Sequence, residues 1–186
     1  MRIIAGEYRG RPIVAPAGRA TRPTGDRVRE ALFSILGPLD GRDVLDLFAG
    51  SGALSFEALS RGARSATAVD RAPAALACIR RNARALGVTD RLRVVGRDWR
   101  AALGAEAAAG RCYGVLLVDP PYSHTTRILA QIAAPLAAVA APRAVVVIEH
   151  AAGEHVCVPG LTVGERRERR YGDSSLTILH LGDPRP

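Results

Sequence analysis

This sequence contains neither a long apolar run nor an apolar N-terminal segment. The strongest apolar runs, Val115–Val118 and Ala144–Ile148, are far shorter than the roughly 20 residues that a membrane-spanning helix needs. The segment Met1–Glu7 turns polar within a few residues, so it lacks the core of a secretory signal. We therefore expect no membrane span and a cytoplasmic protein.

Cysteine is scarce and lysine is missing altogether. Cys78, Cys112 and Cys157 are widely spaced and have no histidines at metal-ligand spacing, which predicts buried thiols and no metal site. All 26 basic residues are arginine, and the formal net charge is +8. A positive potential of this size attracts phosphate, so the composition indicates a polyanionic partner.

Apolar strands and amphipathic helices alternate from residue 43 onward. Strands are predicted at 44–47, 66–69, 92–95, 114–118 and 144–148, and helices at 53–61, 73–86, within 100–109, and at 126–139 with an interruption at Pro135. Five such strands separated by helices predict an α/β fold with a doubly wound, Rossmann-like parallel sheet. The segments 161–170 and 175–181 depart from this rhythm and predict a C-terminal antiparallel strand pair at the far edge.

The N-terminal part divides from this main unit. Residues 1–22 predict a small basic β-hairpin, called the arm below, and residues 23–186 the main domain. A helix is predicted to begin near Asp26, capped by Thr24, with Arg27, Arg29 and Glu30 on its polar side. The arm reads either as a solvated edge hairpin or as a grip on nucleic acid, and the charge of the whole chain favours the second interpretation.

A strand followed by a glycine turn and a helix begins the main domain. The run 44–47 stops at Phe48-Ala49-Gly50-Ser51-Gly52 and resumes with helical spacing. Two glycines let a ligand lie against the main chain at a helix N-terminus. Ser55 stands where a dinucleotide fingerprint has its third glycine, so the turn alone is equally consistent with a structural role.

Further polar signals follow the later strands. Asp70 ends the second strand, Asp98 follows the third, and Asp119-Pro120-Pro121-Tyr122 follows the fourth. In a doubly wound sheet, the loops after the first and fourth strands meet where the winding direction reverses. Asp70 could then accept ribose hydroxyls and Asp98 could reach an adenine amino group, although either aspartate alone could be a helix cap or a surface charge.

With these motifs the chain resembles the class I S-adenosylmethionine-dependent methyltransferases, and more closely the RsmD family, which methylates a guanine N2 of bacterial 16S ribosomal RNA. The resemblance covers nearly the whole chain. It rests on these segments: Arg2-Ile3-Ile4-Ala5-Gly6, Thr21-Arg22-Pro23-Thr24 with Asp26-Arg27-Val28-Arg29-Glu30, Asp46–Gly52, Asp119–Tyr122 and Arg170-Tyr171-Gly172-Asp173.

The resemblance implies a doubly wound methyltransferase sheet, S-adenosylmethionine as cofactor, no metal, and 16S rRNA or the small-subunit particle as partner of a monomer. The implied cofactor residues surround the glycine turn and the ends of the second and third strands: Asp46, Phe48, Ala49, Gly50, Ser51, Gly52, Asp70, Arg71, Asp98 and Trp99. The methionine half is expected along Asp46–Gly52, the ribose at Asp70 and the adenine at Asp98.

The tetrapeptide Asp119–Tyr122 suits transfer of a methyl group to an amine that is conjugated with a ring. Asp119 and the carbonyl of Pro120 would accept the two amino hydrogens, and the prolines at 120 and 121 would fix both acceptors in advance. Pro121 and Tyr122 would contact the base, which stacks on the tyrosine. Further RNA contacts are expected from Arg2, Tyr8, Arg9, Arg11 and Arg22 in the arm.

Two rival functions stay open at this point. Adenine N6 presents the same two hydrogens as guanine N2, so the tetrapeptide alone also fits an adenine methyltransferase acting on DNA or RNA. A non-catalytic RNA-binding assembly factor could also keep the fold, although the intact glycine turn and tetrapeptide argue against it.

Overall fold

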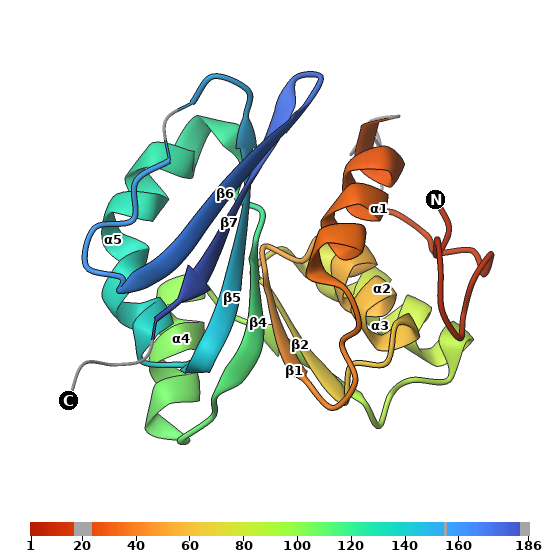
Figure 1. Cartoon of the computed structure of the whole chain (residues 1–186). Helices are drawn as coiled ribbons and strands as arrows, with labels where there is room; N and C mark the ends of the chain where they lie inside the picture. The colour runs from red at the N-terminus through yellow and green to blue at the C-terminus, as the bar shows by residue number, and fades with distance from the viewer. Residues whose placement is uncertain (17–23, 155, 183–186) are drawn as a thin grey trace.

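A seven-stranded sheet with helices on both faces forms the centre of the molecule (Figure 1). This computed structural model describes residues 1–16, 24–154 and 156–182, with the backbone alone at Thr24 and Tyr122. The strands are β1 Asp43–Leu47, β2 Ser65–Asp70, β3 Leu92–Gly96, β4 Tyr113–Val118, β5 Ala140–Ala151, β6 Val163–Tyr171 and β7 Ser174–Leu181. The helices are α1 Thr24–Leu36, α2 Ala53–Ser60, α3 Pro73–Leu86, α4 Trp99–Ala108 and α5 Thr125–Ala137, with a short 3-10 helix, η1, at Tyr122–His124.

The sheet order is β3-β2-β1-β4-β5-β7-β6, and β1 to β5 run parallel. The chain winds outward from β1 to β3 and then returns to β4 on the other side of β1, so the winding reverses between β1 and β4. Strand β7 is antiparallel to both β5 and β6. The predicted doubly wound sheet with a C-terminal antiparallel pair is confirmed.

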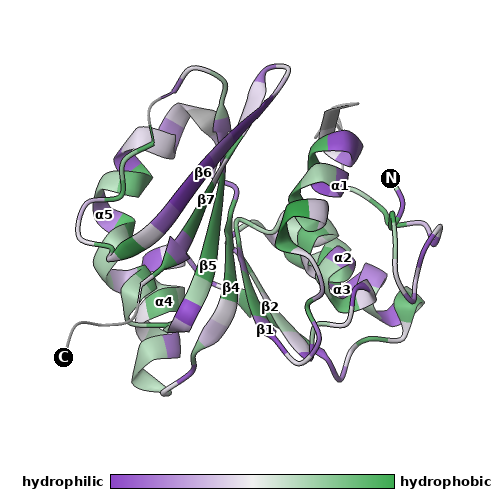
Figure 2. Ribbon diagram, viewed as in Figure 1, coloured by the Kyte–Doolittle hydropathy of each residue, from purple (hydrophilic) through white to green (hydrophobic). Residues whose placement is uncertain are grey.

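Two apolar clusters lie on the two faces of the sheet. Helices α1, α2 and α3 cover one face, where Phe33, Phe56 and Ile79 are fully buried. Helices α4 and α5 cover the other, where Leu103 and Ile132 are fully buried. The inner strands are apolar along most of their length, whereas β6 is hydrophilic (Figure 2). Burial of both faces explains why the inner strands read as continuous apolar runs.

Several boundaries differ from the sequence predictions. Strand β5 begins four residues earlier and ends three residues later than expected, because Ala140 pairs with Tyr113 and Ala151 pairs with Ser174. Helix α5 continues through Pro135 to Ala137. The described part of the arm forms one bridge, Arg2 with Pro12, instead of two full strands.

Three exposure predictions were wrong. Cys78 is a buried thiol as expected, but Cys112 and Cys157 are exposed. Arg29 was placed on the polar side of α1, whereas it is only 5% exposed and lies 3.7 Å from the buried carboxylate of Glu57.

None of the helices in the described ranges is long and apolar enough to cross a membrane.

Candidate functional site

The loops after β1 and β4 lie side by side at the carboxyl edge of the sheet, which is the edge where the parallel strands end. Leu47, the last residue of β1, pairs with Val69 of β2 on one side and Val118 of β4 on the other. The backbone N–H of Asp119 donates to the carbonyl of Leu47 at 3.4 Å. The register therefore confirms that the glycine turn and the tetrapeptide share one edge.

The glycine turn has a tightly constrained backbone. Phe48, Gly50 and Gly52 all have positive φ, of 66°, 57° and 80°. At Gly52, a Cβ atom would come within 2.7 Å of the ring of Phe56, which is fully buried, so glycine is required there by both conformation and space. The N–H of Gly52 donates to the carbonyl of Ala49 at 2.7 Å, and α2 begins directly afterwards. The glycines of the turn therefore let a ligand approach the backbone directly at the start of α2.

Asp46 is a buried carboxylate behind this turn. It is 1% exposed, and its Oδ2 accepts hydrogen bonds from the backbone N–H of Ser55 at 3.1 Å and from the Ser55 hydroxyl at 2.6 Å. Its Oδ1 is buried and has no hydrogen-bond partner among the described residues. Burial raises the pKa of Asp46 to about 7, the negative charge of Asp70 adds to this, and the Ser55 hydrogen bonds oppose it. A buried carboxylate oxygen without a donor suits a cationic ligand group.

Asp70 connects the end of β2 to the glycine turn. Its Oδ2 accepts from the backbone N–H of Gly50 at 2.9 Å, and its Oδ1 accepts from that of Ala72 at 2.8 Å. Each carboxylate oxygen has a second lone pair, so both can still accept a hydrogen bond from a hydroxyl group. The neighbouring Arg71 is exposed. Asp70 thus orders the turn and also presents acceptors at the same edge.

Asp98 and Trp99 have clear structural roles. Asp98 is the N-cap of α4, where its Oδ1 accepts from the backbone N–H of Arg100 at 3.0 Å. Trp99 is 5% exposed within the cluster on the α4 face, and the guanidinium of Arg100 lies 4.3 Å from the centroid of its ring. The adenine contacts predicted for this pair remain a prediction.

The tetrapeptide forms the other half of the edge. Asp119 is half-buried, Pro120 is buried and Pro121 is exposed. The N–H of His124 donates to the carbonyl of Pro121 at 2.8 Å, which closes the loop into η1. The predicted stacking of a base on the Tyr122 side chain lies outside the described residues, and so does the contact predicted for Arg22.

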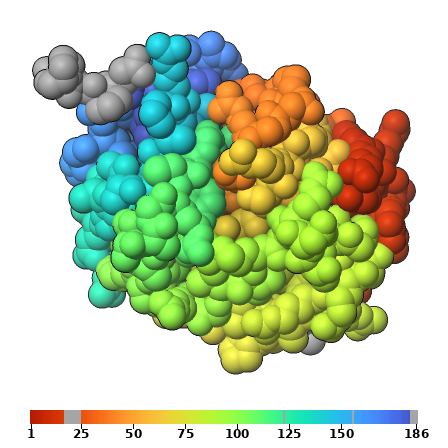
Figure 3. Space-filling view, turned by 90° about the horizontal axis from the view of Figure 1, so that it is seen from below, coloured from red at the N-terminus to blue at the C-terminus, as the bar shows by residue number. Residues whose placement is uncertain are grey.

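The arm spans both edges of the sheet. Its first residues approach the glycine turn, since the Ser51 hydroxyl lies 3.6 Å from the sulfur of Met1 and Arg29 donates to the carbonyl of Arg2 at 2.7 Å. Its tip packs at the opposite, amino-terminal edge, where the guanidinium of Arg91 donates to the hydroxyl oxygen of Tyr8 at 3.3 Å. The arm there borders the segment around residue 90 (Figure 3). The RNA contacts predicted for Arg2, Tyr8, Arg9 and Arg11 remain predictions.

Sequence reasoning missed the groups that anchor the arm. Glu57 is fully buried in α2 and accepts from the backbone N–H groups of Ile4 and Ala5 at 2.9 and 3.1 Å. Gly6 packs so closely that a Cβ atom would lie 1.8 Å from the carbonyl oxygen of Ser60. Asn82 donates to the carbonyls of Val14 and Ser51. Glu57 interrupts an apolar helix, and that was the one signal in the sequence for a buried carboxylate.

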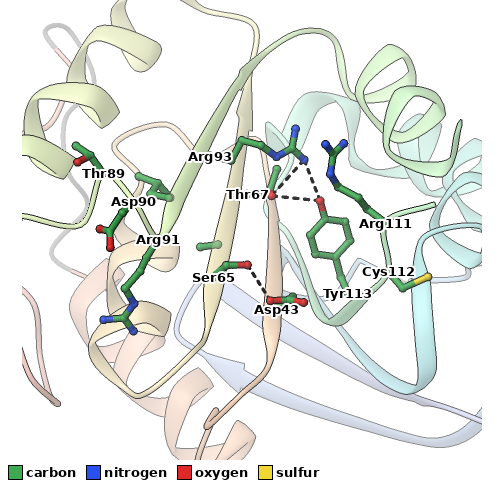
Figure 4. Close-up of a pocket in the computed structure, with 12 residues that line it drawn as sticks. Asp43, Ser65, Thr67, Thr89, Asp90, Arg91, Arg93, Arg111, Cys112 and Tyr113 are labelled. Carbon is green, nitrogen blue, oxygen red and sulfur yellow. Dashed lines mark hydrogen bonds between the residues drawn. The ribbon is translucent and has the colours of Figure 1, made fainter. Parts of the chain in front are cut away.

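A cavity of about 500 Å³ lies at the amino-terminal edge, away from these loops. The first residues of β1 to β4 contribute to its lining, among them Asp43, Ser65 and Tyr113 (Figure 4). Arg91 points away from Arg93, which donates to Thr67 and Tyr113. Within this cavity the Ser65 hydroxyl donates to Asp43, and Arg93, Thr67 and Tyr113 are hydrogen-bonded to one another.

Comparison with known proteins adds an independent line of evidence. The model of the family described as Conserved hypothetical protein 95 matches residues 1–180. The chain is 43% identical over 125 residues to YlbH of Bacillus subtilis, a match that covers 67% of this chain and 68% of that protein. It is 41% identical over 123 residues to ribosomal RNA small subunit methyltransferase D of Escherichia coli, covering 66% of this chain and 60% of the relative.

A solved structure extends the match over the full length. The fold superposes on yhhF of Escherichia coli with a TM-score of 0.85 at 32% sequence identity, covering 99% of both chains. The aligned region thus spans 68% and 60% of the two sequence relatives, whereas the structural match includes nearly all of both molecules.

Proposed function

The chain belongs to the RsmD family of methyltransferases, and we propose that it transfers a methyl group from S-adenosylmethionine to the exocyclic N2 amine of a guanine in 16S ribosomal RNA, in an assembling small subunit. The observation that carries this proposal is the shared edge: the glycine turn after β1 and the Asp119 loop after β4 are joined by the 3.4 Å contact between Asp119 N and Leu47 O. A donor held by the first turn would face an acceptor held by the second.

The residues around the glycine turn fit this cofactor. S-adenosylmethionine, when bound, supplies a methyl group on a sulfonium, which needs no further activation. Asp46 offers its unpartnered oxygen to the amino group of the methionine half. Asp70 offers the remaining lone pairs of its carboxylate to the ribose hydroxyls. The glycine turn allows the close approach of the methionine chain, and Asp98 with Trp99 lies at the adenine end.

The tetrapeptide prepares the amine. The lone pair of a base amine is delocalised into the ring, which makes the nitrogen a poor nucleophile. Asp119 and the carbonyl of Pro120 accept the two amino hydrogens, which favours a pyramidal nitrogen whose lone pair is aimed at the methyl carbon. The N–C bond forms as the S–C bond breaks, and the nitrogen then releases one proton to water. Positioning and two accepted hydrogen bonds supply the rate enhancement.

The direct test is transfer of labelled methyl to 16S rRNA and to partly assembled small-subunit particles, followed by nucleoside analysis. We expect N2-methylguanosine, with more product from particles than from naked RNA. Labelled N6-methyladenosine would establish the adenine alternative, because that amine carries the same two hydrogens. Absence of both transfer and cofactor binding would instead favour a non-catalytic assembly factor.

A further inference from the structure

Strand β6 is an edge strand whose side chains are almost all exposed and mostly charged. Its sequence, VGERRERRY, contains four arginines and two glutamates, and only Tyr171 is partly buried. It appears as a continuous hydrophilic band beside the apolar β7 and β5 (Figure 2). An edge strand this rich in charge resists pairing with another strand, so its open side is suited to a different occupant.

The charges of β6 are unevenly neutralised. In the middle of the strand, Arg167 pairs with Glu165 at 2.6 Å and Arg166 pairs with Glu168 at 3.1 Å. Arg169 and Arg170 donate only to backbone carbonyls, those of Glu168 at 2.9 Å and Gly172 at 3.1 Å. Neither has a carboxylate partner in the described ranges, so two positive charges remain next to the β6–β7 turn.

The register places this turn at the carboxyl edge, the same edge as the tetrapeptide. Val118 of β4 pairs with Ile148 of β5, and His150, two residues further on, pairs with Ser175 of β7. Ser175 in turn pairs with Arg170, which is therefore level with Pro120. Three strand spacings separate β4 from β6, a lateral distance of about 14 Å. The turn and the start of α1 both project at the top of the view, the direction in which β1 and β4 run (Figure 1).

The hairpin end is held in place. The N–H of Ala152, just after β5, donates to the carbonyl of Asp173 at 2.9 Å, and Tyr171 packs against the apolar cluster on the α1 face. Paired residues of a sheet share a face, so Arg169 lies on the face of Leu176, toward α1, and Arg170 lies on the opposite face. The two guanidinium groups thus flank a fixed strand end and are not carried by a loose loop.

We propose that Arg169 and Arg170 form a phosphate-binding clamp for the RNA strand that carries the target base; this surface rests on the proposed function and names where its substrate lies. A base that reaches Asp119 must leave its stack, which brings its flanking phosphates to the carboxyl edge. Exposed guanidinium groups bind phosphate through paired N–H donors. The clamp positions the strand without reading its sequence.

The test compares two double variants with the same loss of charge. Arg169→Gln/Arg170→Gln removes the clamp. Arg42→Gln/Arg84→Gln is the matched control, because both arginines are exposed and lie near the amino-terminal edge. Affinity for a fluorescent 16S rRNA fragment is measured by anisotropy over a range of salt concentrations, and the Kd for S-adenosylhomocysteine by calorimetry.

For the clamp variant we expect RNA affinity to fall roughly tenfold at physiological salt. The slope of log K against log salt should become shallower by about 2. The control should stay within about twofold of wild type, and cofactor affinity should be unchanged in both.

RNA affinity equal to that of the control would overturn the clamp, and so would a change in oligomeric state on gel filtration without a loss of RNA binding, which would mark β6 as a protein interface. Wild-type methyl transfer is measured in the same preparation. If it is present while the clamp variant binds normally, the clamp alone has failed. If it is absent, the proposed function has failed.

Discussion

The two edges of the sheet use charged residues in opposite ways. At the amino-terminal edge, Glu106 is 2% exposed and accepts hydrogen bonds from Arg93 and from the Tyr113 hydroxyl, with Arg111 3.6 Å away. At the carboxyl edge, one oxygen of the buried Asp46 has no hydrogen-bond partner in the part of the chain that the structure describes. Removing one partner of a buried ion pair leaves an uncompensated charge, whereas a buried carboxylate oxygen without a donor can still accept a hydrogen bond from a ligand.

Removing one carboxylate from each edge is the strongest test of this difference. Asp119→Ala should lower kcat for methyl transfer at least about a hundredfold, because the carboxylate that accepts a hydrogen bond from the reacting amine is lost. The Kd for S-adenosylhomocysteine should stay within error. Asp90→Ala removes an exposed carboxylate at the amino-terminal edge and should retain wild-type kcat. A parallel loss of cofactor binding in Asp119→Ala would contradict the role given to Asp119.

Glu106→Gln should reveal the structural role of the other edge. Burial alone would raise the pKa of Glu106, but hydrogen bonds from Tyr113 and Arg93 outweigh it and hold the pKa below its usual value. The ionised group therefore stabilises the fold above its unfolded-state pKa, and this contribution is lost as pH falls through the folded-state pKa.

At pH 7 we expect the free energy of unfolding of Glu106→Gln, measured by urea denaturation, to be about 2 kcal/mol lower than that of wild type. This value allows for the partial exposure of Arg93, which weakens its interaction with Glu106. The deficit should shrink in acid. Glu30→Gln, at an exposed position of α1, should change stability by less than about 0.5 kcal/mol. Equal losses in the two variants would show that the buried network contributes nothing.

Asp46→Asn separates ligand binding from stability at the carboxyl edge. The folded-state pKa of about 7 lies above the unfolded value, so this carboxyl group favours folding at low pH and that contribution is lost as pH rises through 7. The asparagine variant keeps a neutral group, and the ligand-free variant should be more stable than wild type at pH 8.

Cofactor binding should respond in the opposite direction. Between pH 6 and pH 8 the affinity of wild type for S-adenosylhomocysteine should rise about tenfold more than that of Asp46→Asn, because only wild type gains a carboxylate. Calorimetry at both pH values measures the difference, and the ligand's own titration is common to both proteins. Parallel pH profiles would exclude Asp46 as the partner of the amino group.

The smallest expected effect concerns the tip of the arm. Arg11 donates to the carbonyl of Ala85 at the amino-terminal edge, and Arg9 is exposed nearby. Arg9→Gln/Arg11→Gln should lower RNA affinity about threefold, less than the roughly tenfold loss for the β6 clamp, because the tip of the arm lies at the edge opposite the Asp119 loop. Anisotropy under identical salt conditions compares the two. An RNA affinity equal to that of wild type would contradict the RNA contacts predicted for Arg9 and Arg11.

The sequence predicted much of the fold because the elements carry strong local signals. Pro73 near the start of α3 and Gly87 after its end bounded that helix without error. The ends of β5 could not be predicted, because they depend on pairing with Tyr113 and Ser174, which are distant in sequence. The exposure of Cys112 and Cys157 also depends on tertiary position, which composition does not specify.

The site was predictable where strand order alone fixes it. Asp46, Asp70 and Asp119 fall at one edge because their strands are neighbours and parallel. The burial of Arg29 was not predictable, since it depends on the fully buried Glu57 of another helix. Likewise, the division of β6 into paired and unpaired arginines follows from side-chain geometry that a charge count does not contain.

The central claim is that the cofactor occupies the carboxyl edge, between the glycine turn and the Asp119 loop. Backbone amide chemical shifts recorded during titration with S-adenosylhomocysteine test it directly. The account predicts the largest changes at Ala49–Gly52, at Asp70–Ala72 and at Asp119. Largest changes at Thr89–Arg93, beside the cavity at the amino-terminal edge, would contradict it.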